Sequence, residues 1–152
     1  MKTCCILFAL LLSFESFSQN SANVLTVQND FAAFGKGDIQ TIVNSTSEEV
    51  VWTHFGNPSV VPFAGTYNGH EGVSRFFQQV GANSNFLLFE PQDFVESGNT
   101  VTARVNLKSV AIPTGREYSD SVTMVFTFNT VGKITNWEAK GNVGGLESAF
   151  SK

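Results

Sequence analysis

The spacing of apolar residues changes in the middle of the chain, and this change limits the folds that the sequence can adopt. Before residue 84, apolar side chains recur at steps of three and four residues, as on one face of a helix. From residue 84 onward they recur at every second position, as on one face of a strand. A chain of 152 residues with mainly helices first and strands afterwards is expected to be α+β, with the helices against one face of a curved antiparallel sheet.

Three helices are expected in the first part of the chain. Residues 20–34 carry an apolar stripe at helical spacing, and so do residues 71–80, which Gly81 is expected to end. Between them, Asp38 is a candidate N-cap for a short helix over residues 39–43.

The expected strands begin with residues 50–55 (VVWTHF), which are rich in β-forming side chains. Residues 62–67, within a loop rich in glycine and proline, form a candidate extended segment. Four further strands are expected over residues 86–96, with an interruption near Pro91, and over 100–112, 118–129 and 133–140. Short breaks that contain glycine separate these four, so they are predicted to form an antiparallel meander, followed by a helical turn over residues 146–150.

The N-terminus has the features of a secretory signal peptide. Lys2 supplies a positive charge, residues 4–12 (CCILFALLL) are apolar, and Ser16 and Ser18 are small residues before a cleavage site. We therefore expect residues 1–18 to be removed, leaving a single domain over residues 19–152 in a secreted or periplasmic protein.

Composition argues against several classes of partner. The chain has 9 Lys and Arg against 13 Asp and Glu, a net charge of −4, and no run of basic residues, so neither nucleic acid nor, once the signal peptide is removed, a membrane is expected as a partner. Both cysteines leave with the signal peptide and only two histidines remain, so no metal site is expected. Residues 141–145 (GNVGG) lack a phosphate-loop lysine, and no cofactor is expected.

Six short segments occur in a particular order along the chain: residues 31–38 (FAAFGKGD), 49–52 (EVVW), 62–69 (PFAGTYNG), 72–77 (GVSRFF), 125–128 (VFTF) and 132–134 (GKI). In this order they resemble the SnoaL-like, ketosteroid-isomerase-related branch of the nuclear-transport-factor-2-like (NTF2-like) superfamily, over residues 24–150. The resemblance implies a cone-shaped, cystatin-like roll, in which the curved sheet packs on the N-terminal helices. It also implies a pocket between the concave face of the sheet and the helices.

A general base on the first strand is part of what the resemblance implies. Counting from the acidic pair Glu48-Glu49 places this base at His54, whereas counting back from Gly56 places it at Thr53. We favour His54, because an imidazole can accept a proton at physiological pH and because alternate strand residues share a face with Trp52. The alternative is a pocket or core histidine whose only role is a hydrogen bond.

The chain departs from the isomerase pattern at three positions. The aspartate base is absent, the tyrosine of the oxyanion hole corresponds to Asp30, and the acid that partners this tyrosine corresponds to Met124. Without two neutral donors for a developing enolate, isomerisation of the steroid type is not expected.

Other candidate residues follow from alternation along the strands. Asp120 shares a face with Val122 and Met124, so it is a second catalytic candidate that could orient His54 or contact a ligand; the alternative is a solvated strand end. The candidate ligand-binding residues are large and mostly aromatic, and the alternative is that they only fill the core: Trp52, Phe63, Tyr67, Phe76, Met124 and Trp137.

Together these features predict an exported pocket protein that binds a small, largely apolar organic molecule. If it is catalytic, we expect cofactor-free proton transfer of the isomerase, cyclase or lyase type, with His54 as the base. The alternative is a non-catalytic ligand-binding or accessory module. In either case a homodimer through the open face of the sheet is expected.

Overall fold

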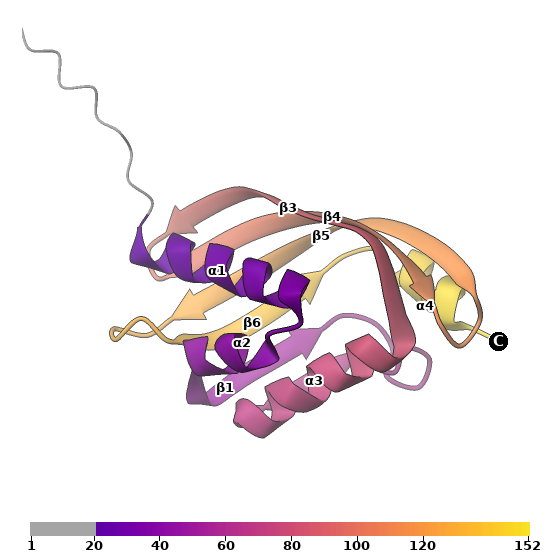
Figure 1. Ribbon diagram of the computed structural model, residues 1–152, viewed down its shortest axis with the longest axis horizontal. Coiled ribbons are helices and arrows are strands. Elements are labelled where there is room, and N and C mark those ends of the chain that lie inside the picture. Colours follow the sequence, from indigo (N-terminus) through magenta and orange to yellow (C-terminus); the bar gives the residue numbers. More distant parts are fainter. Residues whose placement is uncertain (1–20) are drawn as a thin grey trace, which may run out of the picture.

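The computed structural model describes residues 21–152. The predicted signal peptide, residues 1–18, lies outside the described residues. Within the described part, the order of helices and strands matches the α+β arrangement predicted from the change in apolar spacing (Figure 1).

A six-stranded sheet in the order β2-β1-β6-β5-β4-β3 forms the frame of the molecule. The last four strands are antiparallel neighbours in sequence order, which confirms the predicted meander. The first strand extends the sheet, since it runs parallel to β6 and pairs on its other side with the short β2. The strands are β1 Thr46–His54, β2 Gly65–Asn68, β3 Ser84–Ser97, β4 Thr100–Ala111, β5 Arg116–Phe128 and β6 Ile134–Lys140.

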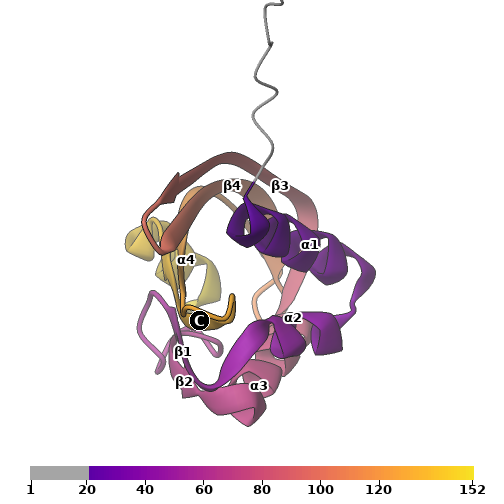
Figure 2. The same ribbon diagram turned by 90° about the vertical axis from the view of Figure 1, so that its left-hand side faces the viewer.

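Four helices accompany the sheet: α1 Ala22–Lys36, α2 Ile39–Ser45, α3 Gly69–Asn83 and α4 Val143–Phe150. Seen end-on, the sheet curves round, and α1, α2 and α3 close its open side (Figure 2). The curved sheet packed on N-terminal helices is the architecture that the sequence predicts. Large apolar side chains fill the space between the two layers, and the largest that are fully buried are Ile134, Val27, Val50, Val61, Val73, Val101 and Val105.

The first helix ends at Lys36, two residues beyond the predicted end, and the second helix begins at its predicted cap, Asp38. Gly37 ends α1 in the left-handed conformation, with φ of 72°, which glycine adopts without steric strain. Asp38 then caps α2, because its Oδ1 accepts a hydrogen bond of 3.2 Å from the backbone N–H of Thr41.

The predicted ends of the second and third helices are also wrong. The second helix runs to Ser45 rather than residue 43, because the Ser45 and Thr46 hydroxyls donate to carbonyls of its last turn and let β1 begin at once. The third helix continues through Gly81 to Asn83. Gly81 does not adopt a positive φ there, and the Asn83 side chain donates to the Gln79 carbonyl at 2.8 Å, which stabilises the final turn.

The predicted interruption near Pro91 takes the form of a bulge. β3 runs continuously over its length, but its register against β4 shifts between Gln92 and Val95, and Asp93 has φ of 54°. The strand tolerates a proline because it lies at the edge of the sheet.

Candidate functional site

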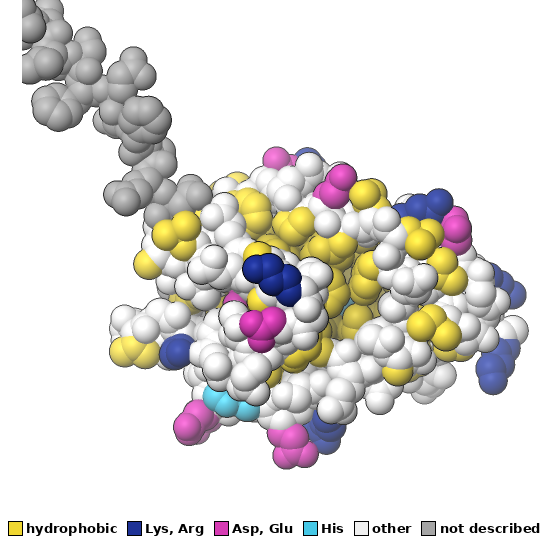
Figure 3. Space-filling model, viewed as in Figure 1, with side chains coloured by type: hydrophobic (Ala, Val, Ile, Leu, Met, Phe, Trp, Pro, Cys, Tyr) yellow, Lys and Arg dark blue, Asp and Glu magenta, His cyan; other side chains and the backbone are white. Residues whose placement is uncertain are grey.

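An aromatic pocket lies between the concave face of the sheet and the helices. The space between its atoms is about 770 Å³, including the part that opens to solvent, and only a small part of it is wide enough for a water-sized sphere. The pocket is therefore narrow. In the view of Figure 3, hydrophobic side chains gather in the hollow between α1, α3 and β3.

Four phenylalanines separate this pocket from a shallower cavity between α1 and β3. Phe31, Phe34, Phe86 and Phe89 line both spaces, so they form the wall between the pocket and the outside. Their rings pack mainly edge-on or tilted, with the Phe34 and Phe89 centroids 4.9 Å apart.

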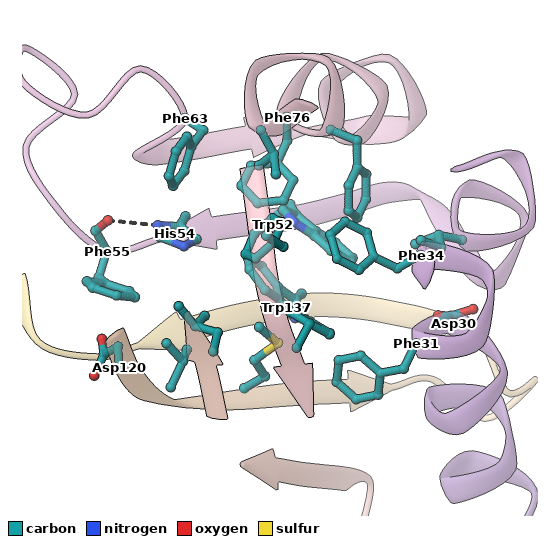
Figure 4. Close-up of a pocket in the computed structure, with 18 of the residues that line it drawn as sticks. Asp30, Phe31, Phe34, Trp52, His54, Phe55, Phe63, Phe76, Asp120 and Trp137 are labelled. Atoms are coloured by element: carbon teal, nitrogen blue, oxygen red, sulfur yellow. Dashed lines mark hydrogen bonds between the residues drawn. The ribbon is translucent and has the colours of Figure 1, made fainter. Parts of the chain in front are cut away.

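A pair of stacked tryptophans forms the middle of the pocket wall (Figure 4). Trp52 on β1 and Trp137 on β6 face each other across the parallel strand pair, with ring centroids 4.5 Å apart and planes 16° from parallel. The Nε1 of Trp52 is buried and has no hydrogen-bond partner among the described residues. A buried N–H without an acceptor is uncommon in folded proteins, so this atom is a candidate donor to a ligand.

His54 is the last residue of β1, and its ring lies in the pocket on the same face of the strand as Trp52. Its Nδ1 is 2.8 Å from the backbone oxygen of Phe55. Because a carbonyl can only accept, Nδ1 carries the hydrogen and Nε2 carries the lone pair. No described residue hydrogen-bonds Nε2, so this lone pair is free for a ligand.

Burial dominates the ionisation of His54. Desolvation lowers the pKa of the imidazole to about 4, although the Phe55 carbonyl and the negative charge of Asp120 both oppose this shift. The ring is therefore neutral at pH 7, and it packs edge-on against Phe63 with centroids 5.0 Å apart. A neutral imidazole with a free Nε2 can accept a hydrogen bond or a proton.

Asp120 lines the pocket near His54, with Val122 and Met124 on the same strand face as the alternation predicted. Its two carboxylate oxygens accept hydrogen bonds from backbone N–H groups, Oδ1 from Ser121 and Oδ2 from Asn142, both at 2.8 Å. Since Asn142 is the N-cap of α4, the carboxylate fixes the turn between β6 and this helix. It makes no hydrogen bond to His54 and acts on it through charge alone.

Asp30 is a pocket residue that the sequence analysis did not propose as functional. It lies on α1 and is only 5% exposed, and burial raises the pKa of its carboxyl group to about 7 despite a hydrogen bond with the Ser45 hydroxyl. The signal was present in the sequence. Asp30 follows Val27 by three residues and so falls on the buried stripe of the helix, where a charged residue is unusual.

The predicted ligand-binding residues fall into two groups. Five of the six line the pocket: Trp52, Phe63, Phe76, Met124 and Trp137. Tyr67 does not, because it lies on β2 and packs its ring edge-on against Phe76, with centroids 5.5 Å apart.

The described residues offer no obvious place for a metal ion. Over residues 21–152, no three His, Cys, Asp or Glu side chains lie close enough to share one. Within the same range, no helix is both long and apolar enough to cross a membrane.

Comparison with known proteins shows which family the sequence matches and which solved structures have a similar fold. The sequence model of the SnoaL-like domain family matches residues 27–137, most of the chain. No curated protein is similar enough in sequence to count as a relative.

Several solved structures share the architecture. An NTF2-like protein of unknown function from Burkholderia pseudomallei is 23% identical, with a TM-score of 0.79 over 88% of this chain and 100% of that chain. An NTF2-like protein from Burkholderia xenovorans is 25% identical, with a TM-score of 0.78 over 88% and 98%. TerC, co-crystallised with polyporic acid, is 21% identical, with a TM-score of 0.74 over 86% and 98%. At these identities the similarity shows the fold alone.

Proposed function

Because the chain belongs to the SnoaL-like domain family, we propose that it binds a small, largely apolar organic molecule in the pocket and that His54 acts as a general base on it. The reaction class is cofactor-free proton transfer of the isomerase, cyclase or lyase type. The structure of TerC with polyporic acid, an organic ligand, is consistent with a related use of this fold.

The observation that carries this proposal is the free Nε2 of His54 in an otherwise aromatic pocket. The tautomer is set by the Phe55 carbonyl, so Nε2 holds the lone pair, and the His54 ring lines the pocket. The unpartnered indole N–H of Trp52 supplies a donor in the same pocket. An acceptor and a donor among apolar walls are the groups that orient a ligand in a typical small-molecule site.

The low basicity of His54 limits the substrate. A base whose conjugate acid has a pKa of about 4 removes only a proton that the substrate itself makes acidic, such as one on carbon next to a carbonyl group. The negative charge of Asp120 favours the imidazolium that forms. In an isomerisation, the imidazolium would deliver a proton to another carbon, which restores the neutral ring. In D2O the imidazolium N–H exchanges with solvent before this step, so the molecule gains deuterium.

Native mass spectrometry of the protein from its own host, followed by incubation in D2O, tests the proposal. We expect a small molecule to co-purify and to gain deuterium while bound to the wild-type protein. The variant His54→Gln keeps a hydrogen-bond acceptor but is a far weaker base, so it should bind the molecule without exchange. Equal exchange in both proteins would refute the role of His54.

A non-catalytic ligand-binding or accessory module is the second candidate, and the lowered pKa of His54 favours it. In that case the Nε2 lone pair only accepts a hydrogen bond from the ligand. The same experiment separates the two functions, because a bound molecule that gains no deuterium in the wild-type protein identifies a binding module.

A homodimer through the outer face of the sheet is a further part of the proposal. The pocket and the helices that enclose it occupy the concave side, so the outer face of β4 and β5 remains broad and mostly polar. Sedimentation equilibrium should give twice the mass of one chain at micromolar concentration. The mass of a single chain would refute dimerisation.

We also propose that the protein is exported, as a secreted or periplasmic protein. The support is the charged and apolar pattern of residues 1–18. N-terminal sequencing of the protein from its own host should begin at Gln19. A mature protein that retains Met1 would refute export through this signal.

A further inference from the structure

Asp30 stands at the opposite end of the pocket from His54 (Figure 4). It is buried on the inner face of α1 together with Val24, Val27 and Ala33. An ionised carboxylate in such surroundings requires a compensating charge or several hydrogen-bond donors. Among the described residues its side chain has one hydrogen-bond partner, the Ser45 hydroxyl.

The hydrogen bonds around Ser45 fit a protonated Asp30. Ser45 Oγ lies 2.7 Å from Asp30 Oδ2 and 2.7 Å from the backbone oxygen of Ile42. A hydroxyl has one hydrogen to donate, and a carbonyl can only accept. If Ser45 donates to Ile42, a protonated Asp30 can donate to Ser45 Oγ, and both short contacts are satisfied. An ionised Asp30 would compete with the carbonyl for a single hydrogen.

No charge in the surroundings of Asp30 offsets this preference for the neutral form. Its pKa reflects burial and the Ser45 hydrogen bond, with no contribution from a charged group on α2, β3 or β4, the elements that pack against α1. The other titratable side chains that line the pocket, His54, Tyr118 and Asp120, stand toward α4 at the far end.

We propose that Asp30 determines the ligand specificity of the pocket, by donating a hydrogen bond from its neutral carboxyl group to a carbonyl oxygen of the bound molecule. Its Oδ1 makes no hydrogen bond to any described residue. When the ligand arrives, the proton of Asp30 is on Oδ1 and points to the ligand oxygen, while Ser45 turns its hydroxyl to Oδ2. This inference rests on the proposed function and names the substrate class more closely.

The ligand class that follows is a flat, uncharged molecule with a ketone or similar oxygen at its α1 end. The narrow space beside the Trp52 and Trp137 stack favours a planar ring system over a bulky aliphatic one. A carboxylate at this end would meet an acceptor as soon as Asp30 lost its proton, so an anionic ligand is disfavoured.

Two probe molecules of the same shape test the inference. Acetophenone carries a ketone oxygen, and α-methylstyrene has a CH2 group in its place. The chain has two tryptophans and both line the pocket, so their indole N–H signals in a ¹⁵N-labelled protein report binding directly. The quantity measured is the ketone preference, the Kd of α-methylstyrene divided by that of acetophenone. The difference in hydration of the two probes cancels when this ratio is compared between proteins or pH values.

In the wild-type protein, we expect the ketone preference to fall about five-fold between pH 5.5 and pH 8.5, as Asp30 loses the proton that it donates. Asp30→Asn keeps an N–H donor at every pH, so its preference should not change with pH. Asp30→Leu has no donor, so its preference should be low at both values. His54 does not change its protonation between pH 5.5 and pH 8.5, because its pKa of about 4 lies below this range, so it does not contribute to the change in ketone preference.

Each outcome decides the question. A wild-type preference that is equal at the two pH values, or an Asp30→Asn variant that loses its preference at pH 8.5 as the wild type does, would overturn the role of Asp30 and leave the pocket intact. If neither probe moves the indole signals, the proposed function fails, and this inference fails with it.

Discussion

Asp30 and His54 are expected to make the stability of the fold depend on pH in opposite directions. Burial raises the pKa of Asp30 from 3.8 to about 7, so between these values the folded protein holds a proton there that the unfolded chain has lost. Stability therefore falls as the pH rises through this range. Burial lowers the pKa of His54 from 6.5 to about 4, so the unfolded chain holds the extra proton and stability rises with pH.

The two effects have similar size. One pKa unit corresponds to about 1.4 kcal/mol, so the raised pKa of Asp30 lowers the free energy of unfolding by up to about 4 kcal/mol as the pH rises from 4 to 7. Deprotonation of His54 raises it by up to about 3 kcal/mol between pH 4 and pH 6.5. Between pH 4 and pH 6.5 the two changes in the free energy of unfolding nearly cancel. The combined contribution of Asp30 and His54 to the stability of the wild-type protein should therefore hardly change with pH.

Single variants make the separate pH dependence of the free energy of unfolding from each residue measurable. With Asp30→Asn only His54 remains, so the free energy of unfolding should rise by about 3 kcal/mol from pH 4 to pH 6.5. At pH 8 this variant should be more stable than the wild type. With His54→Gln only Asp30 remains, and the free energy should fall by about 4 kcal/mol from pH 4 to pH 7.

Urea unfolding followed by tryptophan fluorescence measures these changes at intervals between pH 4 and pH 8. The double variant Asp30→Asn/His54→Gln is the control, since it lacks both groups and should be as flat as the wild type between pH 4 and pH 6.5. Parallel pH profiles for the wild type and both single variants would refute the reasoning. They would mean that neither side chain is buried in the state that we describe.

Three further substitutions test local features by urea unfolding. Asp38→Ala removes the cap that the Thr41 N–H binds and should lower the free energy of unfolding by about 1 kcal/mol; no change would mean that α2 does not depend on this cap. Gly141→Ala places a methyl group against the Asp120 carboxylate and 2.6 Å from the Phe55 ring, and it should lower the free energy of unfolding by about 1–3 kcal/mol; an unchanged value would contradict the close packing. The methyl group that Gly81→Ala adds inside α3 meets no atom within 4 Å, so this variant should raise the free energy of unfolding by about 0.5–1 kcal/mol. A lower free energy of unfolding would contradict a helical Gly81.

Alternation along the strands predicted much of the pocket, because a pleated strand turns every second side chain to the same face. This reasoning placed Trp52 with His54 on β1, and Asp120 with Met124 on β5, and all four line the pocket. It could not place Tyr67. A four-residue strand carries too few alternating positions to show which face is inside.

The helix ends were harder to predict than the helices, because hydrogen bonds of a few side chains decide them. Ser45 and Thr46 suggest a turn by composition, but in the fold their hydroxyls donate to the last carbonyls of α2. Gly81 is a common terminator, yet nothing requires it to adopt a positive φ. Such choices depend on neighbours that only the folded chain brings together.

Asp30 shows why residue type alone does not predict which side chains in the pocket can donate a hydrogen bond. By residue type, an aspartate at the position of the isomerase tyrosine predicts the loss of a neutral donor, because an exposed aspartate is ionised at pH 7. Burial on α1 favours the protonated form, against the opposing effect of the Ser45 hydrogen bond, and the protonated carboxyl group can donate. The thioether of Met124, at the second donor position, still has no hydrogen to give. A single donor, the protonated Asp30, is enough to orient a ligand that has one carbonyl group. The enolate of a steroid-type isomerisation would lack its second hydrogen bond in this pocket.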